Sequence, residues 1–244
     1  MRKFGLIGFP LTHSFSGKFF NQKFEREQIS DAEYRLYPID TILQFPDLIK
    51  GLGEDLVGLN VTIPYKQSVI QYLDDLSEEA QQIQAVNTIL FKDGKLKGFN
   101  TDIPGFEQSL LHFIDEQVIN ALVLGNGGAS KAVQFVLDKL RINFKTVSRS
   151  SSSGTITYDQ LDESILQTSR LIINTTPLGM APRITEYPEF DYTVLSDQHY
   201  LYDLIYNPSK TIFLSKGEAQ GSKIQNGLDM LYRQAEASWK IWNQ

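Results

Sequence analysis

A glycine-rich turn is the clearest chemical signal in this sequence of 244 residues. An apolar run leads into Gly125-Asn126-Gly127-Gly128-Ala129, where a helix is expected to open. Glycines allow a tight turn, and they let the backbone approach a pyrophosphate more closely than a Cβ would permit. The free N–H groups and positive dipole end of the helix would then face the phosphates. The pattern favours a dinucleotide site, with a plain surface turn between a core strand and a core helix as the alternative.

A second group that could bind the same ligand follows that helix. After a strand expected at 143–147, the sequence reads Ser148-Arg149-Ser150, where a fold that binds NAD carries Asp or Glu for the ribose hydroxyls. An arginine between two hydroxyls suits the 2′-phosphate of NADP, because the planar guanidinium can bond two phosphate oxygens at once. The alternative is a solvated loop arginine. The serine run that follows, 151–154, is expected to be a linker.

Two serines near the N-terminus could hold a polar ligand. Ser14 and Ser16 follow a strand that ends at Pro10, and in an extended segment their side chains would point to the same side. Both hydroxyls could then grip one carboxylate or hydroxyl. The alternative is that Ser16 caps the following helix.

A lysine and an aspartate stand at two further expected helix starts. Pro64 suits the first turn of a helix, which would place Lys66 in that turn. The helix dipole disfavours a lysine there, so the position needs compensation such as a nearby carboxylate. Asp102 has the position of a helix cap, which is its simplest role. An exposed lysine without a role remains the alternative for Lys66.

Alternating strands and helices are expected to position these groups. In the first part of the chain, strands and helices alternate over 4–9, 18–26, 34–38, 42–49 and 56–62. This alternation implies a parallel sheet. A helix at 77–84 and a hairpin over 85–100 follow, and the favoured pair Asp93-Gly94 forms the hairpin turn.

The second part of the chain repeats the alternation after a domain boundary that we expect before the glycine turn. Further elements are predicted at 105–113, 129–141, 159–168, 171–174, 199–206 and 211–219. Four strand–helix steps of this kind predict a doubly wound sheet, whose strands form a ligand crevice at their carboxyl ends. The last segment, from residue 225, is an amphipathic helix that could return to the first domain.

Composition narrows the classes of partner. The formal net charge is -6 and no Lys/Arg-rich run occurs, which argues against a nucleic-acid surface and favours a small-molecule partner. The absence of cysteine excludes disulfides, thiolate metal sites and a cysteine nucleophile. His13, His112 and His199 form no metal-binding pair, so no catalytic metal is expected. Without a signal-peptide pattern or an apolar stretch of membrane-spanning length, a cytoplasmic protein is expected.

With these pieces in place, the sequence resembles the shikimate dehydrogenase family, NADP-dependent reductases of aromatic amino-acid biosynthesis. The likeness covers nearly the whole chain and rests on motifs that occur in the family's order. These are Ser14-Phe-Ser16, Asn60-Val-Thr62-Ile-Pro64-Tyr-Lys66, Ala85-Val-Asn87-Thr88, Gly98-Phe-Asn100-Thr101-Asp102, Gly125-Asn-Gly127-Gly128-Ala129, Asn174-Thr-Thr-Pro177-Leu-Gly179-Met180 and Gln225-Asn-Gly227.

The resemblance implies a two-domain α/β enzyme that transfers hydride reversibly between NADPH and the ketone of 3-dehydroshikimate. Residues 1–103, with 225–244 packing back on them, would form an α/β substrate-binding and catalytic domain, and 104–224 a Rossmann-type NADP-binding domain. Lys66 and Asp102 would be catalytic. Substrate would be bound by Ser14, Ser16, Thr62, Asn87, Tyr206 and Gln234. The cofactor would be bound by Gly125, Asn126, Gly127, Gly128, Ala129, Ser148, Arg149, Ser150, Leu204 and Gly227.

The chemistry of that reaction suits the two catalytic residues. Hydride arriving at a ketone carbon puts negative charge on the oxygen, so a proton or a positive field is needed there. Lys66 could supply both, and Asp102 would orient it and hold its charge. Which of the two transfers the proton stays open, because their protons belong to one coupled system. The oligomeric state also stays open, with a homodimer as one candidate.

Several positions depart from the family pattern. Asn126 replaces the usual alanine, Gly17 a frequent proline, and Gln84 a common glycine. Ser148-Arg149-Ser150 replaces Asn-Arg-Thr without a second arginine, so a weaker preference for NADP is expected. Three other functions remain as alternatives: a quinate or quinate/shikimate dehydrogenase, a sensor that binds such ligands without turnover, and a reductase of another small carbonyl compound.

Overall fold

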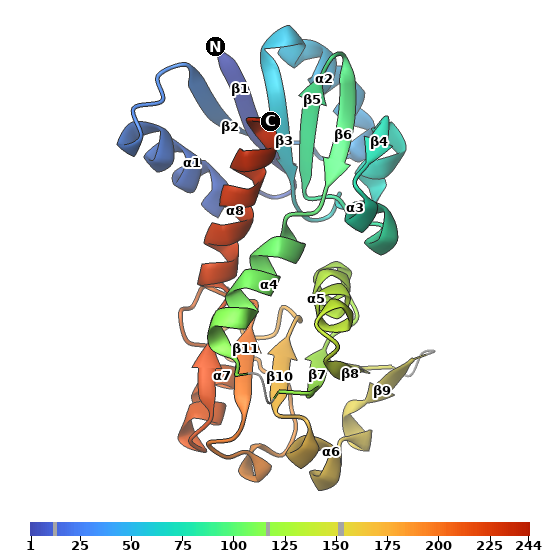
Figure 1. The fold of residues 1–244 in the computed structure, drawn as a ribbon, viewed down its shortest axis with the longest axis vertical. Helices are drawn as coiled ribbons and strands as arrows, with labels where there is room; N and C mark the ends of the chain where they lie inside the picture. The colour runs from blue at the N-terminus through green and yellow to red at the C-terminus, as the bar shows by residue number, and fades with distance from the viewer. Residues whose placement is uncertain (12–13, 116–117, 151–153) are drawn as a thin grey trace. The chain divides into compact units, whose positions relative to one another are not determined.

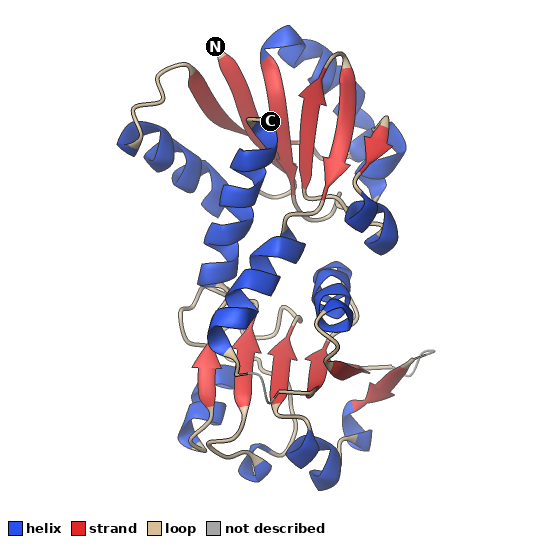
Figure 2. Cartoon of the chain, viewed as in Figure 1, coloured by secondary structure: helices blue, strands red, loops and turns tan. Residues whose placement is uncertain are grey.

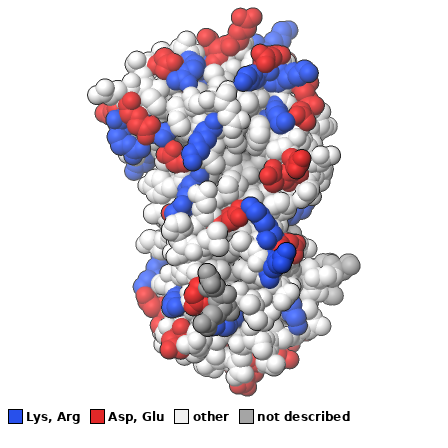
Figure 3. All heavy atoms as spheres, in the orientation of Figure 1, with Lys and Arg blue, Asp and Glu red and all other residues white. Residues whose placement is uncertain are grey.

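The computed structural model describes residues 1–11, 14–115, 118–150 and 154–244, and the chain divides into two compact units (Figures 1 and 2). The first unit comprises Met1–Thr101 and Gln234–Gln244, and the second comprises Asp102–Arg233. Among the described residues, no helix combines the length and the apolar character needed to cross a membrane. On the visible face of each unit, acidic and basic side chains are interspersed (Figure 3).

The first unit contains a mixed six-stranded sheet in the order β2-β1-β3-β5-β6-β4. Its strands are β1 (Arg2–Gly8), β2 (Ala32–Pro38), β3 (Leu56–Val61), β4 (Asp75–Leu76), β5 (Thr88–Lys92) and β6 (Lys95–Phe99). Strand β1 runs parallel to β2 and β3, whereas β5 is antiparallel to β3 and β6. The parallel pairing expected from the alternation is confirmed for β1, β2 and β3, and the predicted hairpin adds β5 and β6, which run antiparallel because a tight turn joins them. Asp93 and Gly94 form that turn with φ values of 53° and 73°, as the hairpin prediction requires.

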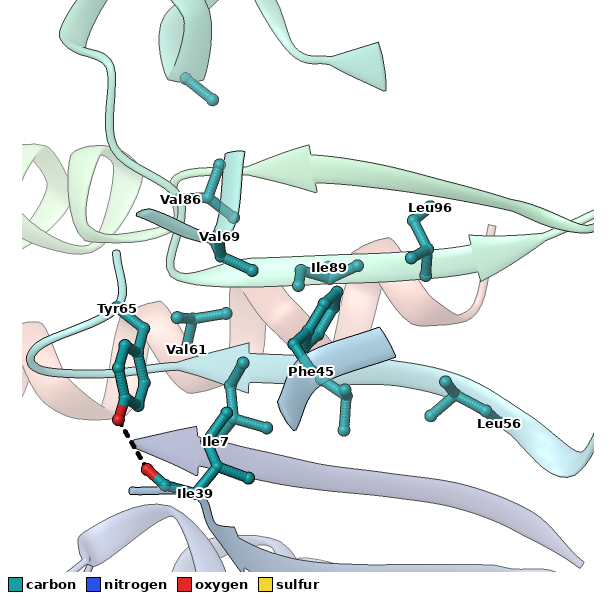
Figure 4. Packing of buried hydrophobic residues seen from close by; sticks show 12 residues of the cluster. Ile7, Ile39, Phe45, Leu56, Val61, Tyr65, Val69, Val86, Ile89 and Leu96 are labelled. Carbon is teal, nitrogen blue, oxygen red and sulfur yellow. Dashed lines mark hydrogen bonds between the residues drawn. The ribbon is translucent and has the colours of Figure 1, made fainter. Parts of the chain in front are cut away.

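The helices of the first unit are short. They are α1 (Phe15–Arg26), η1 (Ile42–Gln44), α2 (Phe45–Leu52), η2 (Gly53–Asp55), η3 (Ser68–Tyr72) and α3 (Glu78–Ile83), of which the η elements are 3-10 helices. Ser77 caps α3 as expected, since its hydroxyl accepts the N–H of Ala80 at 3.2 Å. One core cluster lies under η1, α2 and η3, and Figure 4 shows Phe45 and Ile89 packed together in it.

The end of helix α8 (Leu228–Trp242) packs on the first unit, as predicted. Trp242 lies 5.0 Å from the ring of Phe4 between centroids, and its indole N–H donates to the carbonyl oxygen of Ile89 at 2.9 Å. A Cβ on Gly58 would lie 2.1 Å from that indole nitrogen, so only glycine allows this approach. The large side chain of Trp242 thus fixes the helix on the sheet, and Gly58 leaves the space that this side chain needs.

The second unit contains a fully parallel sheet in the order β12-β11-β10-β7-β8-β9. Its elements are α4 (Asp102–Phe113), β7 (Asn120–Leu124), α5 (Gly128–Lys139), β8 (Asn143–Ser148), β9 (Thr155–Thr157), η4 (Tyr158–Gln160), α6 (Glu163–Thr168), β10 (Leu171–Asn174), η5 (Tyr192–Val194), β11 (Tyr200–Asp203), α7 (Ile212–Ala219) and β12 (Lys223–Gln225). The strand order reverses between β7 and β10, which confirms the doubly wound sheet. In such sheets, ligands typically bind at the carboxyl ends of the strands beside this reversal point.

Three details of the second unit differ from the predictions. The three-residue edge strands β9 and β12 were not expected, and α6 begins only at Glu163, after a separate 3-10 turn. The segment between β10 and β11, which is described throughout, contains η5 but no α-helix. Pro177, Pro182 and Pro188 interrupt this segment, and each lacks the N–H that a helix interior needs. The sheet therefore has six strands rather than four regular strand–helix steps.

Candidate active site

The first glycine of the turn is required by the protein itself. Gly125 follows β7 with φ of 107°, a conformation that residues with a side chain rarely adopt. Its N–H donates to the carbonyl oxygen of Val147 at 2.8 Å, which ties the turn to β8. A Cβ on Gly125 would lie 2.7 Å from Thr175 Oγ1, so the turn also packs against the end of β10.

Neither backbone conformation nor packing against the described residues requires glycine at positions 127 and 128. Gly127 is the N-cap of α5 with an extended backbone (φ of -92°), and a Cβ on either Gly127 or Gly128 would meet no described heavy atom within 4 Å. Residues 126–129 are exposed. Glycine here leaves room next to the unpaired N–H groups of a twelve-residue helix, which is what a phosphate group needs. Ser130, in the place of a third glycine, uses its hydroxyl internally by donating to the Gly127 carbonyl oxygen at 2.7 Å.

The loop after β8 offers one exposed guanidinium. The Ser148 hydroxyl donates to the Ser150 carbonyl oxygen and lies 3.3 Å from Thr155 Oγ1, so it contacts both sides of the loop. Arg149 and Ser150 are exposed. Burial raises the pKa of the nearby Tyr158 to about 12, and the charge of Arg149 opposes that shift. Residues 151–153 of the linker expected at 151–154 lie outside the described residues, as does His13, whereas Gly154 is described as an exposed turn residue.

The loop after β11 reaches the same edge of the sheet. The N–H of Leu204 donates to the carbonyl oxygen of Asn174 at 3.0 Å, and that of Gly227 donates to Ile205 at 3.1 Å. A Cβ on Gly227 would lie 2.0 Å from the Leu204 carbonyl oxygen, which explains the glycine by backbone packing. Tyr206 is half-buried, and burial raises the pKa of its phenol.

A buried carboxylate that the sequence did not single out supports this edge. Asp203, fully buried at the end of β11, accepts the Asn174 amide at 3.1 Å, the Ile205 N–H at 3.0 Å and the Thr211 hydroxyl at 2.6 Å. Burial raises its pKa to about 6, and these three donors limit the rise. Asp203 thereby joins the ends of β10 and β11 to the start of α7.

In the first unit, the structure changes the geometry of the two serines. Helix α1 begins at Phe15, so Ser14 is its N-cap position and Ser16 lies in its first turn; they do not share an extended segment. The expectation of an extended segment was wrong because the apolar side of the helix begins with Phe15, Phe19 and Phe20. Ser14 Oγ is buried and has no hydrogen-bond partner among the described residues, whereas the Ser16 hydroxyl hydrogen-bonds with Tyr34.

Lys66 lies in a turn and not at a helix start. The segment after β3 leads to the 3-10 helix η3, which begins only at Ser68, so the helix-dipole argument for Lys66 does not apply. Tertiary contacts hold the segment instead: the Tyr65 hydroxyl donates to the Ile39 carbonyl oxygen at 2.6 Å (Figure 4), and the Lys66 carbonyl oxygen accepts the Val86 N–H at 2.7 Å. The N–H of Thr62 donates to the Ile7 carbonyl oxygen at 2.9 Å.

Asn87 and Gln234 are both buried in the first unit and meet through one threonine. Thr101 donates its backbone N–H to Asn87 Oδ1 at 2.7 Å, and its hydroxyl lies 3.4 Å from Gln234 Oε1. Asp102, the next residue, is the first residue of α4 and not its cap. A carboxylate in a first helical turn is favoured by the helix dipole. Among the described residues, no group of His, Cys, Asp and Glu side chains could hold a metal ion.

The geometry defines a class of protein. A doubly wound parallel sheet, with a glycine turn and a helix N-terminus at its reversal point, is typical of an α/β protein that binds a dinucleotide, here joined to a second α/β unit. The first unit also matches, over residues 6–89, the family model described as the shikimate dehydrogenase substrate binding domain.

Comparison with whole proteins identifies the family. The chain is 39% identical to the NADP-dependent shikimate dehydrogenase of Clostridium beijerinckii, with 100% of this chain and 93% of the relative covered. The crystal structure of the Thermus thermophilus shikimate 5-dehydrogenase with NADP(H) and shikimate is similar at a TM-score of 0.88 and 30% identity, covering 99% and 93%. A Corynebacterium glutamicum quinate dehydrogenase with NAD has a TM-score of 0.87 at 25% identity, covering 99% and 93%. The chain belongs to the shikimate dehydrogenase family.

Proposed function

We propose that this chain is an NADP-dependent shikimate dehydrogenase, which interconverts shikimate and 3-dehydroshikimate. The observation that carries the proposal is full-length similarity to curated relatives of that name, at 36–39% identity for the first three. The unfilled space beside Gly127 and Gly128 supports it from the structure, because it leaves an anion access to the start of α5. The nicotinamide ring, when bound, exchanges the hydride.

We assign the cofactor to the second unit. Gly125, Asn126, Gly127, Gly128 and Ala129 would bind the pyrophosphate through backbone N–H groups. Ser148, Arg149 and Ser150 would bind the 2′-phosphate, with the exposed guanidinium as the charged partner. Leu204 and Gly227, which pack against each other, would line the site beside them.

We assign the substrate to a domain over 1–103, with 225–244 packing back on it, and the cofactor to a domain over 104–224. Ser14 and Ser16 would bind the carboxylate, helped by Tyr206. The buried Ser14 hydroxyl is well suited to this role, because none of the described residues uses it. Thr62, Asn87 and Gln234 would bind the ring hydroxyls. This arrangement would fix one face of the ring toward the reacting groups.

For the reaction itself, we assign Lys66 and Asp102. During reduction the ketone oxygen gains negative charge; the Lys66 ammonium would stabilise that charge, and the coupled pair of Lys66 and Asp102 would supply the proton. The Asp102 carboxylate would orient the ammonium. In the oxidative direction the same pair would accept the proton from the alcohol. The tertiary contacts of Tyr65 and of the Lys66 carbonyl oxygen fix the backbone from which the lysine extends.

The test is the absorbance of reduced nicotinamide when purified protein meets shikimate with NADP, shikimate with NAD, and quinate with each cofactor. A strong signal with shikimate and NADP is expected. Comparable signals with NAD would mean that Ser148-Arg149-Ser150 does not discriminate, and a stronger signal with quinate would reassign the substrate. Silence in all four, with binding retained, would indicate a sensor. The proposal places the enzyme in the cytoplasm, and light scattering would establish whether it forms a homodimer.

A further inference from the structure

A cluster of three buried hydroxyls lies beneath the substrate residues assigned to the first unit. Thr88 on β5, Thr101 before α4 and Ser238 on α8 have exposed fractions of 0%, 1% and 0%. The Thr88 hydroxyl lies 2.8 Å from that of Ser238 and 3.1 Å from that of Thr101, and Ser238 and Thr101 are 3.2 Å apart. None of the three belongs to the proposed binding or catalytic residues.

The cluster fixes the orientation of the Asn87 side-chain amide. A backbone N–H can only donate, and that of Thr101 lies 2.7 Å from Asn87 Oδ1. The Thr88 hydroxyl also donates to this oxygen at 3.1 Å, and the Thr101 hydroxyl lies 3.1 Å from it. Turning the amide over would bring its NH2 group against the backbone N–H, donor against donor. The amide oxygen is therefore committed to the protein, and its NH2 group is what Asn87 can offer to a ligand.

The donors of the cluster follow one direction, set by a buried asparagine. Asn60 Nδ2 lies 3.3 Å from the Asn87 carbonyl oxygen, which can only accept, so the NH2 group of Asn60 must face it. The same NH2 group also lies 3.2 Å from Thr88 Oγ1 and 3.0 Å from Ser238 Oγ, so its two hydrogens are shared among three acceptors. The Thr88 hydroxyl can then use its own hydrogen to donate a hydrogen bond to Asn87 Oδ1.

The first donor in this series of hydrogen bonds, the Tyr34 hydroxyl, stays protonated across the working pH range. Tyr34 donates its hydroxyl to Asn60 Oδ1 at 2.8 Å, and burial raises the pKa of this tyrosine well above its usual value. Hydrogen bonds therefore run from Tyr34 through Asn60 and Thr88 to Asn87 without an ionised group. In a low-dielectric interior such a chain holds its end members in one orientation.

Thr101 links this series of hydrogen bonds to Gln234, the proposed substrate-binding residue on α8. Its single hydroxyl proton has two acceptors, Asn87 Oδ1 at 3.1 Å and Gln234 Oε1 at 3.4 Å. Ser238, one helical turn after Gln234, donates to the Gln234 carbonyl oxygen at 3.0 Å. Asn87, which directly precedes β5, and the helix that carries Gln234 thus share one hydroxyl cluster.

We propose that Thr88, Thr101 and Ser238 are positioning residues of the substrate pocket, which present the Asn87 NH2 group as a donor to a hydroxyl oxygen of the substrate and align Gln234 with it. This inference rests on the proposed function for the identity of the substrate. It extends that function by assigning hydrogen-bond polarity at Asn87 and by giving the C-terminal helix a part in substrate alignment.

The test compares Thr101→Val, which keeps the shape and the backbone N–H but removes the hydroxyl, with Thr101→Ser, which restores the hydroxyl. Thr101→Val is expected to raise KM for shikimate about tenfold, the effect of roughly one lost neutral hydrogen bond. KM for NADP and the pH profile of kcat should stay within twofold, and Thr101→Ser should recover most of the loss. Thr146→Val, at a buried threonine of β8, is the matched control and should leave both KM values unchanged.

Two outcomes would overturn the inference: an unchanged KM for shikimate in Thr101→Val, or an equal rise in both KM values that serine does not rescue. A wild-type protein without shikimate turnover would instead refute the proposed function, which separates the two failures. If Thr101→Val does not fold, Ser238→Ala gives a second reading. It should raise KM for shikimate about threefold while leaving KM for NADP unchanged, and no change in either would count against the cluster.

Discussion

The two units support their proposed ligand sites with different kinds of buried polar groups. Beneath the substrate residues of the first unit, the groups are neutral hydroxyls and amides, centred on Thr88, Thr101 and Ser238. At the sheet edge of the second unit, the central group is the carboxylate of Asp203. Neutral groups keep their hydrogen-bond pattern as pH changes, whereas a buried carboxylate does not. The hydroxyl cluster of the first unit should therefore keep its hydrogen bonds over the pH range in which Asp203 of the second unit changes its protonation.

The largest effect expected from this difference concerns stability and Asp203. Its pKa rises from 3.8 in the unfolded chain to about 6 in the folded protein, so the folded state favours the protonated form. This contribution to stability is complete below pH 4 and is lost as pH rises through 6, a total of about 3 kcal/mol. Asp203→Asn should remove that loss, so its stability relative to wild type should rise by about this amount between pH 4 and pH 8.

Urea unfolding of wild type and Asp203→Asn at pH 4.5, 6 and 8 would measure this difference in the free energy of unfolding. Asp191→Asn is the matched control, because Asp191 also accepts hydrogen bonds near the sheet but is exposed, and its bonds with Thr193 lower its pKa. The control should show no gain toward high pH. A difference in unfolding free energy between wild type and Asp203→Asn that does not vary with pH would contradict the pH dependence attributed to Asp203.

The second expected effect concerns the glycines that the protein itself does not need. Gly127→Ala should change the free energy of unfolding by less than about 1 kcal/mol, because its Cβ meets no described atom and the backbone is extended. NADP should nevertheless bind at least about tenfold more weakly, since the methyl group occupies space that the pyrophosphate requires.

Calorimetric titration of NADP would measure this loss. Gly51→Ala is the control in the first unit: its Cβ is equally unopposed on α2, and its affinity for NADP should match that of wild type. Wild-type affinity in Gly127→Ala would mean that the cofactor does not approach the turn.

The smallest effect concerns a helix end in the first unit. Gln84 follows α3 in the left-handed region with φ of 52°, where glycine is favoured, which gives a physical reason for the glycine common in the family. Gln84→Gly should stabilise the protein by about 0.5 kcal/mol, because relief of the backbone strain exceeds the loss of a side-chain hydrogen bond to Gln81.

Thermal unfolding of Gln84→Gly beside Gln81→Gly would test this. Gln81 lies inside α3, where glycine costs about 1 kcal/mol, so the two substitutions should have opposite signs. Destabilisation by both would show that the left-handed position is not strained.

The sequence predicted the features that local chemistry determines. The Asp93-Gly94 hairpin, the Ser77 cap and the glycine turn after β7 each depend on a few adjacent residues, and all three are present. The expected helix at Lys66 failed because contacts with Ile39 and Val86, distant in sequence, hold that segment in a turn. Local propensity carries no information about such contacts.

The hydroxyl cluster and Asp203 could not be predicted from the sequence, because their surroundings also depend on residues that are distant in the chain. Thr88 and Ser238 are 150 residues apart, and only the packing of α8 on the sheet brings their hydroxyls to 2.8 Å. Asp203 gave no signal because a buried carboxylate and an exposed one look alike in sequence. Strands β9 and β12 contain three residues each, too few for a periodic pattern.

The measurement that tests the account most directly is turnover of shikimate by Lys66→Ala, with calorimetric titration of NADP on the same sample. Lys66 belongs to the first unit and the glycine turn to the second, so the substitution should separate catalysis from cofactor binding. We predict that kcat falls by at least about a hundredfold, as for loss of a general acid–base group, while Kd for NADP stays within twofold. Retained turnover, or NADP affinity lost together with turnover, would contradict the assignment of Lys66 as a catalytic residue.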